Sequence, residues 1–348
     1  MTPPAATAPR PARESPEGGV QTMTYREAIR LALREEMQLD ERVFVMGEEV
    51  GLFDGSYKVT AGLMDEFGSE RVRDTPISEE AFVGAGIGAA MIGERPVVEI
   101  MTLNFLLVAM DQVVNHAAKV GAMFGGEVRV PMVIRTPNGA GNQLTAQHSQ
   151  SFDGWFAGTP GLKVVAPSNP ADARALLKAA IRDDDPVLFI ENLPIYKEKG
   201  EVDTEDDSLG EIGRAAILRE GTDLTLCAHS FATVRCLEVA DLLEQRHGYS
   251  VEVVDLRSLR PLDVETVAAS VAKTNRALCV EEGWPSYGVT AELAARIQRA
   301  CFDELDAPVE RVGMAEVPLP YSKPLELGAM PGKDRICAAA LATLEGAR

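Results

Sequence analysis

The stretch RPVVEIMTLNFLLVAMDQVVNHAAKVGAMFGGEVRVPMVIRT, residues 95–136, contains the pattern that decides the fold. It begins with RPVVEIM and ends with VPMVIRT, short runs rich in Val and Ile that are typical of buried strands. Between them, LLVAMDQVVNHAAKV has the length and apolar content of a helix. A strand, a helix and a second strand in this order predict two parallel strands joined by a crossover helix.

The same alternation extends through most of the chain. Strands are also predicted over RVFVMG, LKVVAP and PVLFIEN, with a helix over ADARALLKAAIRDD. A second series follows, in which strand-like DLTLCAHS, VEVVDLRS and RALCVEEGW are separated by helices expected over 233–246 and 263–273. Alternating strands and helices predict an α/β fold in which mainly parallel sheets are covered by helices on both faces.

Two domains are expected from the chain length of 348 residues. The charged segment 197–211, KEKGEVDTEDDSLGE, has almost no apolar period and is interpreted as a linker or long surface loop. We therefore predict domains over 23–205 and 206–348. Residues 1–22 are rich in Pro and Ala and are predicted to be a disordered tail. Thr24 and Glu27 fit a capping box for a first helix that ends near Leu39.

The composition limits the classes of partner. The net charge is −19, which disfavours nucleic acid and anionic membranes and favours a basic protein module. The sequence contains no run of about 18 apolar residues, so no membrane-spanning helix is predicted. The cysteines are odd in number and widely spaced, which favours reduced thiols in a cytoplasmic protein over disulfides or a zinc site. They are Cys227, Cys236, Cys279, Cys301 and Cys337.

Two adjacent acids, Glu79 and Glu80, follow Pro76 and Ser78 at a predicted helix start. Ser78 is a candidate N-cap, and acids in a first turn interact favourably with the helix dipole, so both glutamates fit a capping role. The alternative is that one of them is a buried carboxylate with a raised pKa. Carboxylates of this kind often serve in catalysis. The residues alone leave both interpretations open.

The run VGAGIGAA places Gly84, Gly86 and Ala89 at the spacing of a dinucleotide-binding fingerprint. That fingerprint directly follows a strand, whereas DTPISEEAF precedes this one. Close packing of a helix against another backbone, at a subunit interface, is the better interpretation, and an NAD-dependent dehydrogenase is the rival one.

His148 lies between two glutamines in a Gly- and Ser-rich segment without hydrophobic period. Nearby glycines make the backbone permissive, and Phe152, Trp155 and Phe156 supply aromatic cover that ordinary surface loops rarely need. A catalytic or substrate-binding role and a locally hydrogen-bonded surface histidine both fit. The acidic triplet 183–185 is interpreted as a solvated loop, with a divalent-metal site as the alternative.

Several motifs in order, including DTPISEEAFVGAGIGAAMIGERPVVEIMTLNF, RTPNGAG, AQHSQSF, AIRDDDPVLFIEN and VEEGWPSYGV, resemble the beta subunits of two-chain 2-oxo acid dehydrogenase decarboxylase components. The resemblance covers the chain from about Met23 to the C-terminus and is nearest to the pyruvate branch. It implies a transketolase-like pyrimidine-binding domain, a transketolase C-terminal-like domain and thiamine diphosphate as cofactor.

In the family, an alpha subunit supplies the diphosphate and magnesium site. This chain fits the beta subunit in this respect, because it lacks the GDG motif followed by paired asparagines that binds diphosphate and magnesium. The resemblance thus implies a heterotetramer of two alpha and two beta chains. It also implies docking on a dihydrolipoyl acyltransferase core through that protein's peripheral-subunit-binding and lipoyl domains.

The resemblance also assigns residues. Glu79 matches the glutamate that hydrogen-bonds the 1′ nitrogen of the aminopyrimidine, Phe105 an aromatic packed on that ring, and His148 the histidine of acyl transfer. Glu80 keeps its structural interpretation. A potassium ion bound by backbone carbonyls is implied at the positions of Met132, Ala180, Asp183 and Asp185.

The expected reaction is oxidative decarboxylation of pyruvate with reductive acetylation of lipoyl groups. Branched-chain 2-oxo acids or acetoin are alternative substrates, and a non-catalytic interaction subunit is an alternative function. The EKGEV region resembles bacterial members of the family, which predicts a bacterial cytoplasm.

Overall fold

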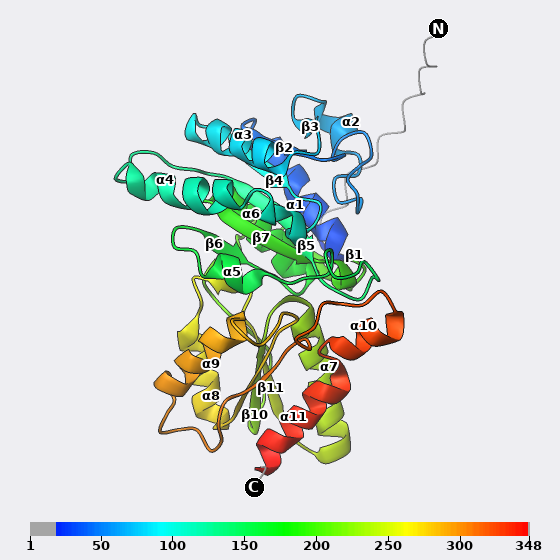
Figure 1. The fold of residues 1–348 in the computed structure, drawn as a ribbon, viewed down its shortest axis with the longest axis vertical. Coiled ribbons are helices and arrows are strands. Elements are labelled where there is room, and N and C mark those ends of the chain that lie inside the picture. The colour runs from blue at the N-terminus through cyan, green and yellow to red at the C-terminus, as the bar shows by residue number, and fades with distance from the viewer. Residues whose placement is uncertain (1–18, 347–348) are drawn as a thin grey trace.

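Two largely parallel sheets form the framework of the structure, a computed structural model that describes residues 19–346 (Figure 1). The larger sheet has seven strands in the order β12-β6-β7-β5-β4-β2-β3. All its neighbours pair in parallel except β12 with β6. Its strands are β2 (Val43–Gly47), β3 (Val72–Asp74), β4 (Arg95–Glu99), β5 (Val133–Asn138), β6 (Lys163–Val165), β7 (Val187–Asn192) and β12 (Ser258–Arg260).

The smaller sheet has five strands in the order β14-β13-β10-β11-β9, and only β9 pairs antiparallel to its neighbour. Its strands are β9 (Ala216–Arg219), β10 (Leu224–Ala228), β11 (Val251–Asp255), β13 (Ala277–Val280) and β14 (Glu310–Val312). Both sheets confirm the predicted fold class and the predicted strands of each series.

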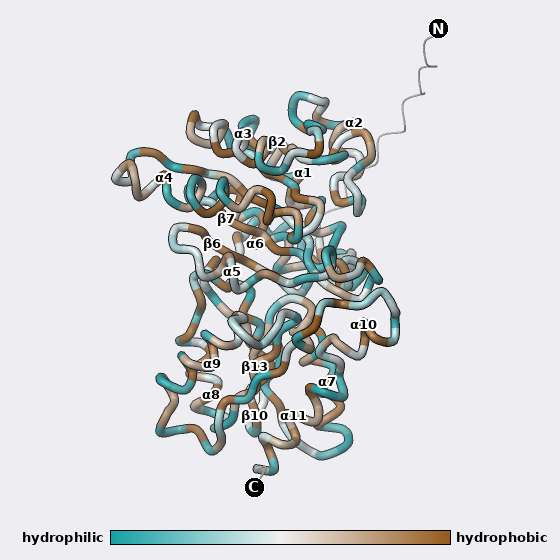
Figure 2. Tube along the Cα trace, in the orientation of Figure 1, coloured by the Kyte–Doolittle hydropathy of each residue, from teal (hydrophilic) through white to brown (hydrophobic). Residues whose placement is uncertain are grey.

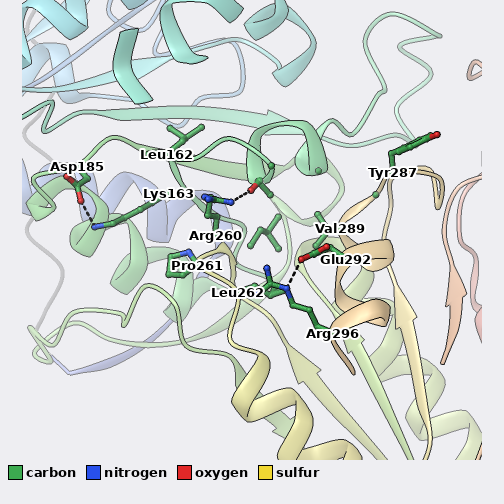
Figure 3. A pocket seen from close by; sticks show the side chains of 16 residues that line it. Leu162, Lys163, Asp185, Arg260, Pro261, Leu262, Tyr287, Val289, Glu292 and Arg296 are labelled. Atoms are coloured by element: carbon green, nitrogen blue, oxygen red, sulfur yellow. Dashed lines mark hydrogen bonds and ion pairs between the residues drawn. The ribbon is translucent and has the colours of Figure 1, made fainter. Parts of the chain in front are cut away.

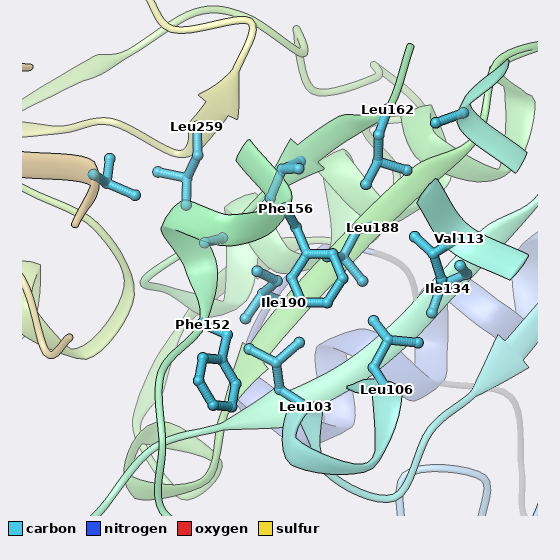
Figure 4. Packing of buried hydrophobic residues seen from close by; sticks show 14 of the residues in the cluster. Leu103, Leu106, Val113, Ile134, Phe152, Phe156, Leu162, Leu188, Ile190 and Leu259 are labelled. Carbon is cyan, nitrogen blue, oxygen red and sulfur yellow. The ribbon is translucent and has the colours of Figure 1, made fainter. Parts of the chain in front are cut away.

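Helices cover both faces of the larger sheet, because neighbouring strand residues alternate between two cores. Val98, Ile134 and Leu188 join one core, which includes Phe82 and Phe156 (Figure 4). The residues next to them, at 97, 133 and 189, join the opposite core. The first face carries α3 (Glu79–Met91), the 3-10 helix η1 (Leu103–Leu107), the π-helix η2 (Gln112–Ala117), α4 (Ala118–Met123) and α5 (Asp153–Ala157); the second carries α1 (Tyr25–Leu39) and α6 (Pro170–Arg182).

The smaller sheet is likewise placed between helices, and Figure 2 shows the hydrophobic segments gathered between the layers of the molecule. The predicted helices 233–246 and 263–273 are confirmed by α7 (Ser230–His247) and α8 (Val264–Thr274). The helix predicted after β4 is instead divided among η1, η2 and α4. The remaining helices are α2 (Leu63–Phe67), η3 (Leu193–Ile195), α9 (Val289–Ala300), α10 (Lys323–Ala329) and α11 (Lys333–Glu345).

The N-terminal tail prediction is partly wrong. Residues 1–18 lie outside the described residues, but Val20–Thr24 forms strand β1. It pairs antiparallel with β8 (Lys199–Asp203), which lies within the segment predicted as a linker. Each strand supplies the backbone partners that the other needs, so neither requires an apolar period of its own. The capping box of α1 is confirmed, since the Thr24 and Glu27 side chains bond each other's backbone N–H groups.

The two halves are joined by more than a linker. Strand β12, from the second half, pairs with β6 and so completes the first sheet. The boundary near residue 205 stays a prediction; β8 ends at Asp203 and β9 begins at Ala216.

The sequence predicted neither disulfides nor a membrane-spanning helix, and the structure describes residues 19–346 in both respects. The five cysteines are free thiols, four buried and Cys337 half-buried, as predicted. Within residues 19–346, no helix is both long and apolar enough to cross a membrane.

Candidate functional site

The predicted site residues follow parallel strands of the larger sheet. β3, β2, β4 and β5 are adjacent and parallel, so their carboxyl ends lie at one edge of the sheet. Glu79 follows β3, Phe105 follows β4 and His148 follows β5. A further residue, Glu48, directly follows β2. In open α/β sheets, ligands bind outside the carboxyl ends of the strands, and this edge is therefore the candidate site.

Glu79 is the buried member of the acidic pair. It is the first residue of α3 and only 7% exposed, whereas Glu80 is exposed. No hydrogen bond to the Glu79 carboxylate is present within residues 19–346. Burial, followed by the charge of Glu79, raises the pKa of Glu48. The structure therefore brings two carboxylates to this edge, and Glu48 was missed because a Gly-Glu-Glu sequence after a strand resembles an ordinary turn.

The start of α3 differs from the predicted capping arrangement. Ser78 makes no side-chain cap; its hydroxyl donates to the carbonyl of Pro76 at 3.2 Å. The close packing predicted for the glycines lies within the chain, since a Cβ on Gly86 would be 2.7 Å from Val98. Gly84 and Gly86 lie inside the helix rather than in a strand-to-helix turn, which rules out the dinucleotide fingerprint.

Phe105 and His148 are in direct contact. Their ring centroids are 5.1 Å apart, and the planes meet at 81°, an edge-to-face arrangement. The carboxamide oxygen of Asn104 accepts the Gln150 N–H at 3.2 Å and so ties the two segments together. Both rings are half-buried, so part of each remains accessible to solvent.

The aromatic residues that follow His148 separate into two groups. Phe156 is fully buried in the core, while Trp155 is 54% exposed. Phe152 lies between Trp155 and Trp284, with centroid distances of 4.7 and 6.2 Å. Because Trp284 belongs to the second half of the chain, this stack joins the His148 segment to the C-terminal half.

A buried polar network behind this segment was not predicted. Asp153 accepts from the Asn138 carboxamide at 2.8 Å and lies 3.3 Å from the His229 ring nitrogen Nε2. Burial lowers the pKa of His229, but the hydrogen bond and charge of Asp153 outweigh it, so the pKa lies above its ordinary value. Glu282 accepts from Asn192 at 2.5 Å. Asn138 and Asn192 end strands β5 and β7, and their partners come from segments distant in sequence, so no sequence signal identifies the network.

The acidic loop 183–185 is surrounded by cations. Asp183 and Asp185 both pair with Lys163, at 2.7 and 3.2 Å, and Asp184 pairs with Arg95 at 2.6 Å. No cluster of His, Cys, Asp and Glu side chains suited to a metal ion occurs in the described part of the chain. The carbonyls predicted to bind potassium partly accept hydrogen bonds: Met132 from Val187, Ala180 from Asp183, and Asp183 from Arg95.

A separate cavity of about 710 Å³ lies between α5, β12 and α9 (Figure 3). Its charged residues are largely paired, Lys163 with Asp185 and Arg296 with Glu292. None of Glu79, Phe105 and His148 lines it. The candidate site is therefore the open carboxyl edge of the larger sheet and not this cavity.

The residues at that edge fit part of a thiamine cofactor. A buried carboxylate without a hydrogen-bond partner suits a ring nitrogen, and a half-buried Phe105 suits the face of an aminopyrimidine. Large apolar side chains nearby are strongly exposed: Leu52 (81%), Phe53 (60%), Ile77 (82%) and Val108 (59%). Such residues beside a functional edge are typical of a surface that another subunit covers.

Two family models match the chain. The transketolase pyrimidine-binding domain matches residues 21–198, and the transketolase C-terminal domain matches residues 213–336. Among solved structures, one titled split gene transketolase, inactive beta4 tetramer, superimposes with a TM-score of 0.74. The superposition covers 95% of this chain and the whole of that structure's chain. The sequence identity is 24%, so this likeness supports the fold alone.

Curated relatives are more similar in sequence. The mitochondrial pyruvate dehydrogenase E1 component subunit beta-2 of Oryza sativa subsp. japonica is 48% identical over 97% of this chain and 90% of its own. The E1 subunit beta of Rhizobium meliloti is 50% identical over 89% of this chain and 67% of its own. The mitochondrial E1 subunit beta of Rattus norvegicus is 50% identical over 89% of this chain and 87% of its own.

Proposed function

The chain belongs to the family of pyruvate dehydrogenase E1 beta subunits, and we propose that it provides one half of a thiamine-diphosphate site at the carboxyl edge of its larger sheet. The reaction is the oxidative decarboxylation of pyruvate and the reductive acetylation of lipoyl groups. One observation carries the proposal: Glu79, Phe105 and His148, far apart in sequence, follow β3, β4 and β5, parallel strands whose carboxyl ends share one edge of the sheet, and the last two residues are in contact.

Each residue has a separate task. Thiamine diphosphate, when bound, supplies the nucleophilic carbon and electron sink that decarboxylation requires. Glu79 would hold the 1′ nitrogen of the bound aminopyrimidine by a hydrogen bond, which its burial would strengthen. Phe105 covers the ring face. His148 holds or moves a proton at its imidazole during acyl transfer, and its edge-to-face contact with Phe105 fixes the ring.

An alpha partner is implied by the family and completes the site. The proposal places it over the exposed residues Leu52, Phe53, Ile77 and Val108, which surround the site in sequence. The finer assembly is a tetramer of two alpha and two beta chains, with magnesium and diphosphate held by alpha. The outer face of α3 adds to this surface, since Gly88 faces open space and Ile92 is 84% exposed.

The decisive test is decarboxylation with an artificial electron acceptor, using the chain with and without its alpha partner, plus thiamine diphosphate and magnesium. Activity that requires both chains and is greatest on pyruvate supports the proposal. Preference for branched-chain 2-oxo acids or acetoin would replace only the substrate. Inactivity of the pair with every such substrate would favour a non-catalytic interaction subunit.

A potassium ion held by the carbonyls of Met132, Ala180, Asp183 and Asp185 is part of the proposal. Carbonyl oxygens have two lone pairs, so the hydrogen bonds that three of them accept leave room for a cation. Comparing the unfolding temperature in potassium and sodium chloride at equal ionic strength tests it. Equal temperatures in the two salts would remove the ion from the proposal.

Docking to a dihydrolipoyl acyltransferase core is proposed through that protein's basic peripheral-subunit-binding domain and its lipoyl domains. The net charge of −19 supports an electrostatic contact. Binding is expected to weaken as salt rises, and binding insensitive to salt would contradict the contact. A bacterial cytoplasm is the proposed location, which the free cysteines support.

A further inference from the structure

The segment 139–150, which leads from β5 to His148, is fastened at its beginning by the C-terminal half of the chain. Ala140 donates its N–H to Glu282 at 2.6 Å. Gly141 and Gln143 donate theirs to Glu326 at 2.9 and 3.0 Å. Three backbone N–H groups of the segment are thus held by two carboxylates more than 100 positions away in sequence.

Glu326 belongs to α10, which Figure 1 shows at the border between the two halves of the molecule. Its side chain is fully buried. A buried carboxylate that accepts two backbone N–H groups is a strong and geometrically restrictive anchor. Lys323, from the same helix, donates to the carbonyl of Gly141 and lies 3.7 Å from Glu326, so α10 holds both the N–H and the C=O of Gly141.

The fastened backbone is in a conformation that it would not keep unaided. Gly139 and Gly141 have positive φ, which glycine tolerates. Gln143 and Thr145, with φ of 57° and 68°, occupy the left-handed region that other residues disfavour. Such conformations persist where the surroundings enforce them, and they concentrate at functional sites. The N–H of Gln143 is one of the two that Glu326 holds.

At its other end the segment meets the candidate site. The Gln150 N–H is held by Asn104, the neighbour of Phe105, and His148 contacts Phe105 in between. The direction in which His148 points is therefore set by two fixed ends. One is held by Asn104 of η1 and the other by α10.

Building on the function proposed above, we propose that Glu326 is a positioning residue for acyl transfer: with Lys323, it holds segment 139–145 so that His148 faces Phe105 and an incoming lipoyl group. Its effect is specific to the half-reaction that uses His148. Glu79 and Phe105 lie on other segments, so decarboxylation itself does not depend on this anchor.

The test uses the complete alpha–beta assembly with thiamine diphosphate and magnesium. Glu326→Gln keeps the side-chain size but replaces one acceptor oxygen by an amide donor. Reductive acetylation of a lipoyl domain is expected to fall between about tenfold and about a hundredfold. Decarboxylation with an artificial acceptor, and KM for pyruvate, should stay within about twofold. Glu316→Gln is the control, because Glu316 is exposed and, within residues 19–346, accepts only from Ser286.

Two further measurements keep the proposal falsifiable. Hydrogen exchange of the amides of Gly141 and Gln143 should speed up in Glu326→Gln and not in the control. Lys323→Met, at a partly exposed position, should reduce acetylation in the same direction even where Glu326→Gln does not fold. Equal losses in decarboxylation and acetylation, or no loss in acetylation, would overturn the positioning role.

His148→Ala separates this inference from the function on which it rests. If His148→Ala loses acetylation while Glu326→Gln and Lys323→Met do not, the inference fails and the proposed function stands. If His148→Ala leaves acetylation unchanged, the role proposed for the histidine fails first.

Discussion

Glu282 is expected to make the folded chain less stable as pH rises, and a single substitution isolates its effect. Burial, opposed by hydrogen bonds from Ala140 and Asn192, raises the pKa of Glu282 from 4.5 to about 7. The charge of Asp153 raises this pKa further, and that of His229 lowers it. The perturbation is Glu282→Gln, which keeps the shape and removes the ionisation.

The sign and size of the effect of Glu282 on folding stability follow from proton linkage. Between pH 4.5 and about 7 the folded chain retains a proton on Glu282 that the unfolded chain has lost. The stabilisation present below pH 4.5 therefore disappears as pH rises through about 7. At 1.36 kcal/mol for each pH unit between the two values, the loss is about 3 kcal/mol. Glu282→Gln lacks this loss.

The assay is calorimetric unfolding of the alpha–beta assembly at pH 5 to 8 and constant ionic strength. From the low to the high end, the wild type should lose several °C relative to Glu282→Gln. The raised pKa of His229 acts in both proteins, so apart from its coupling to Glu282 it cancels in the difference. Glu310→Gln, at an exposed position, should parallel the wild type. A wild-type minus Glu282→Gln difference that is the same at every pH would refute the reasoning.

Three other outcomes are expected. Glu79→Gln should reduce decarboxylation by at least about a hundredfold, while the assembly with alpha, checked by sedimentation, is unchanged; retained turnover would remove Glu79 from the site. Phe156→Ala, at a fully buried position in the core of Figure 4, should cost about 3–5 kcal/mol of stability, and a change below about 1 kcal/mol in denaturant unfolding would contradict that burial. Iodoacetamide should modify Cys337 before the four buried cysteines of the native protein, as read by peptide mass spectrometry; earlier labelling of Cys236 would contradict the packing.

Local and periodic signals were enough for much of the fold. Alternating apolar runs predicted β2, β4, β5, β6 and β7 because strands buried on both faces need continuous Val and Ile. The capping box of Thr24 and Glu27 was predictable because both partners lie within one helical turn. The motifs around Glu79, Phe105 and His148 were enough to indicate the family, which the comparisons confirm.

Contacts between distant segments were decided only by the tertiary structure. Strands β1 and β8 form by pairing with each other across the chain, so neither composition nor period predicted them. Asp153 and His229, or Glu326 and Gln143, come together from distant segments, and their burial depends on what packs against them and not on sequence spacing. The sequence by itself therefore determined the apolar strands of both sheets, helices α1, α3, α6, α7 and α8, and the family. The anchors that hold His148 against Phe105 were decided by the fold, because a buried carboxylate is stable only where folding brings backbone donors to it.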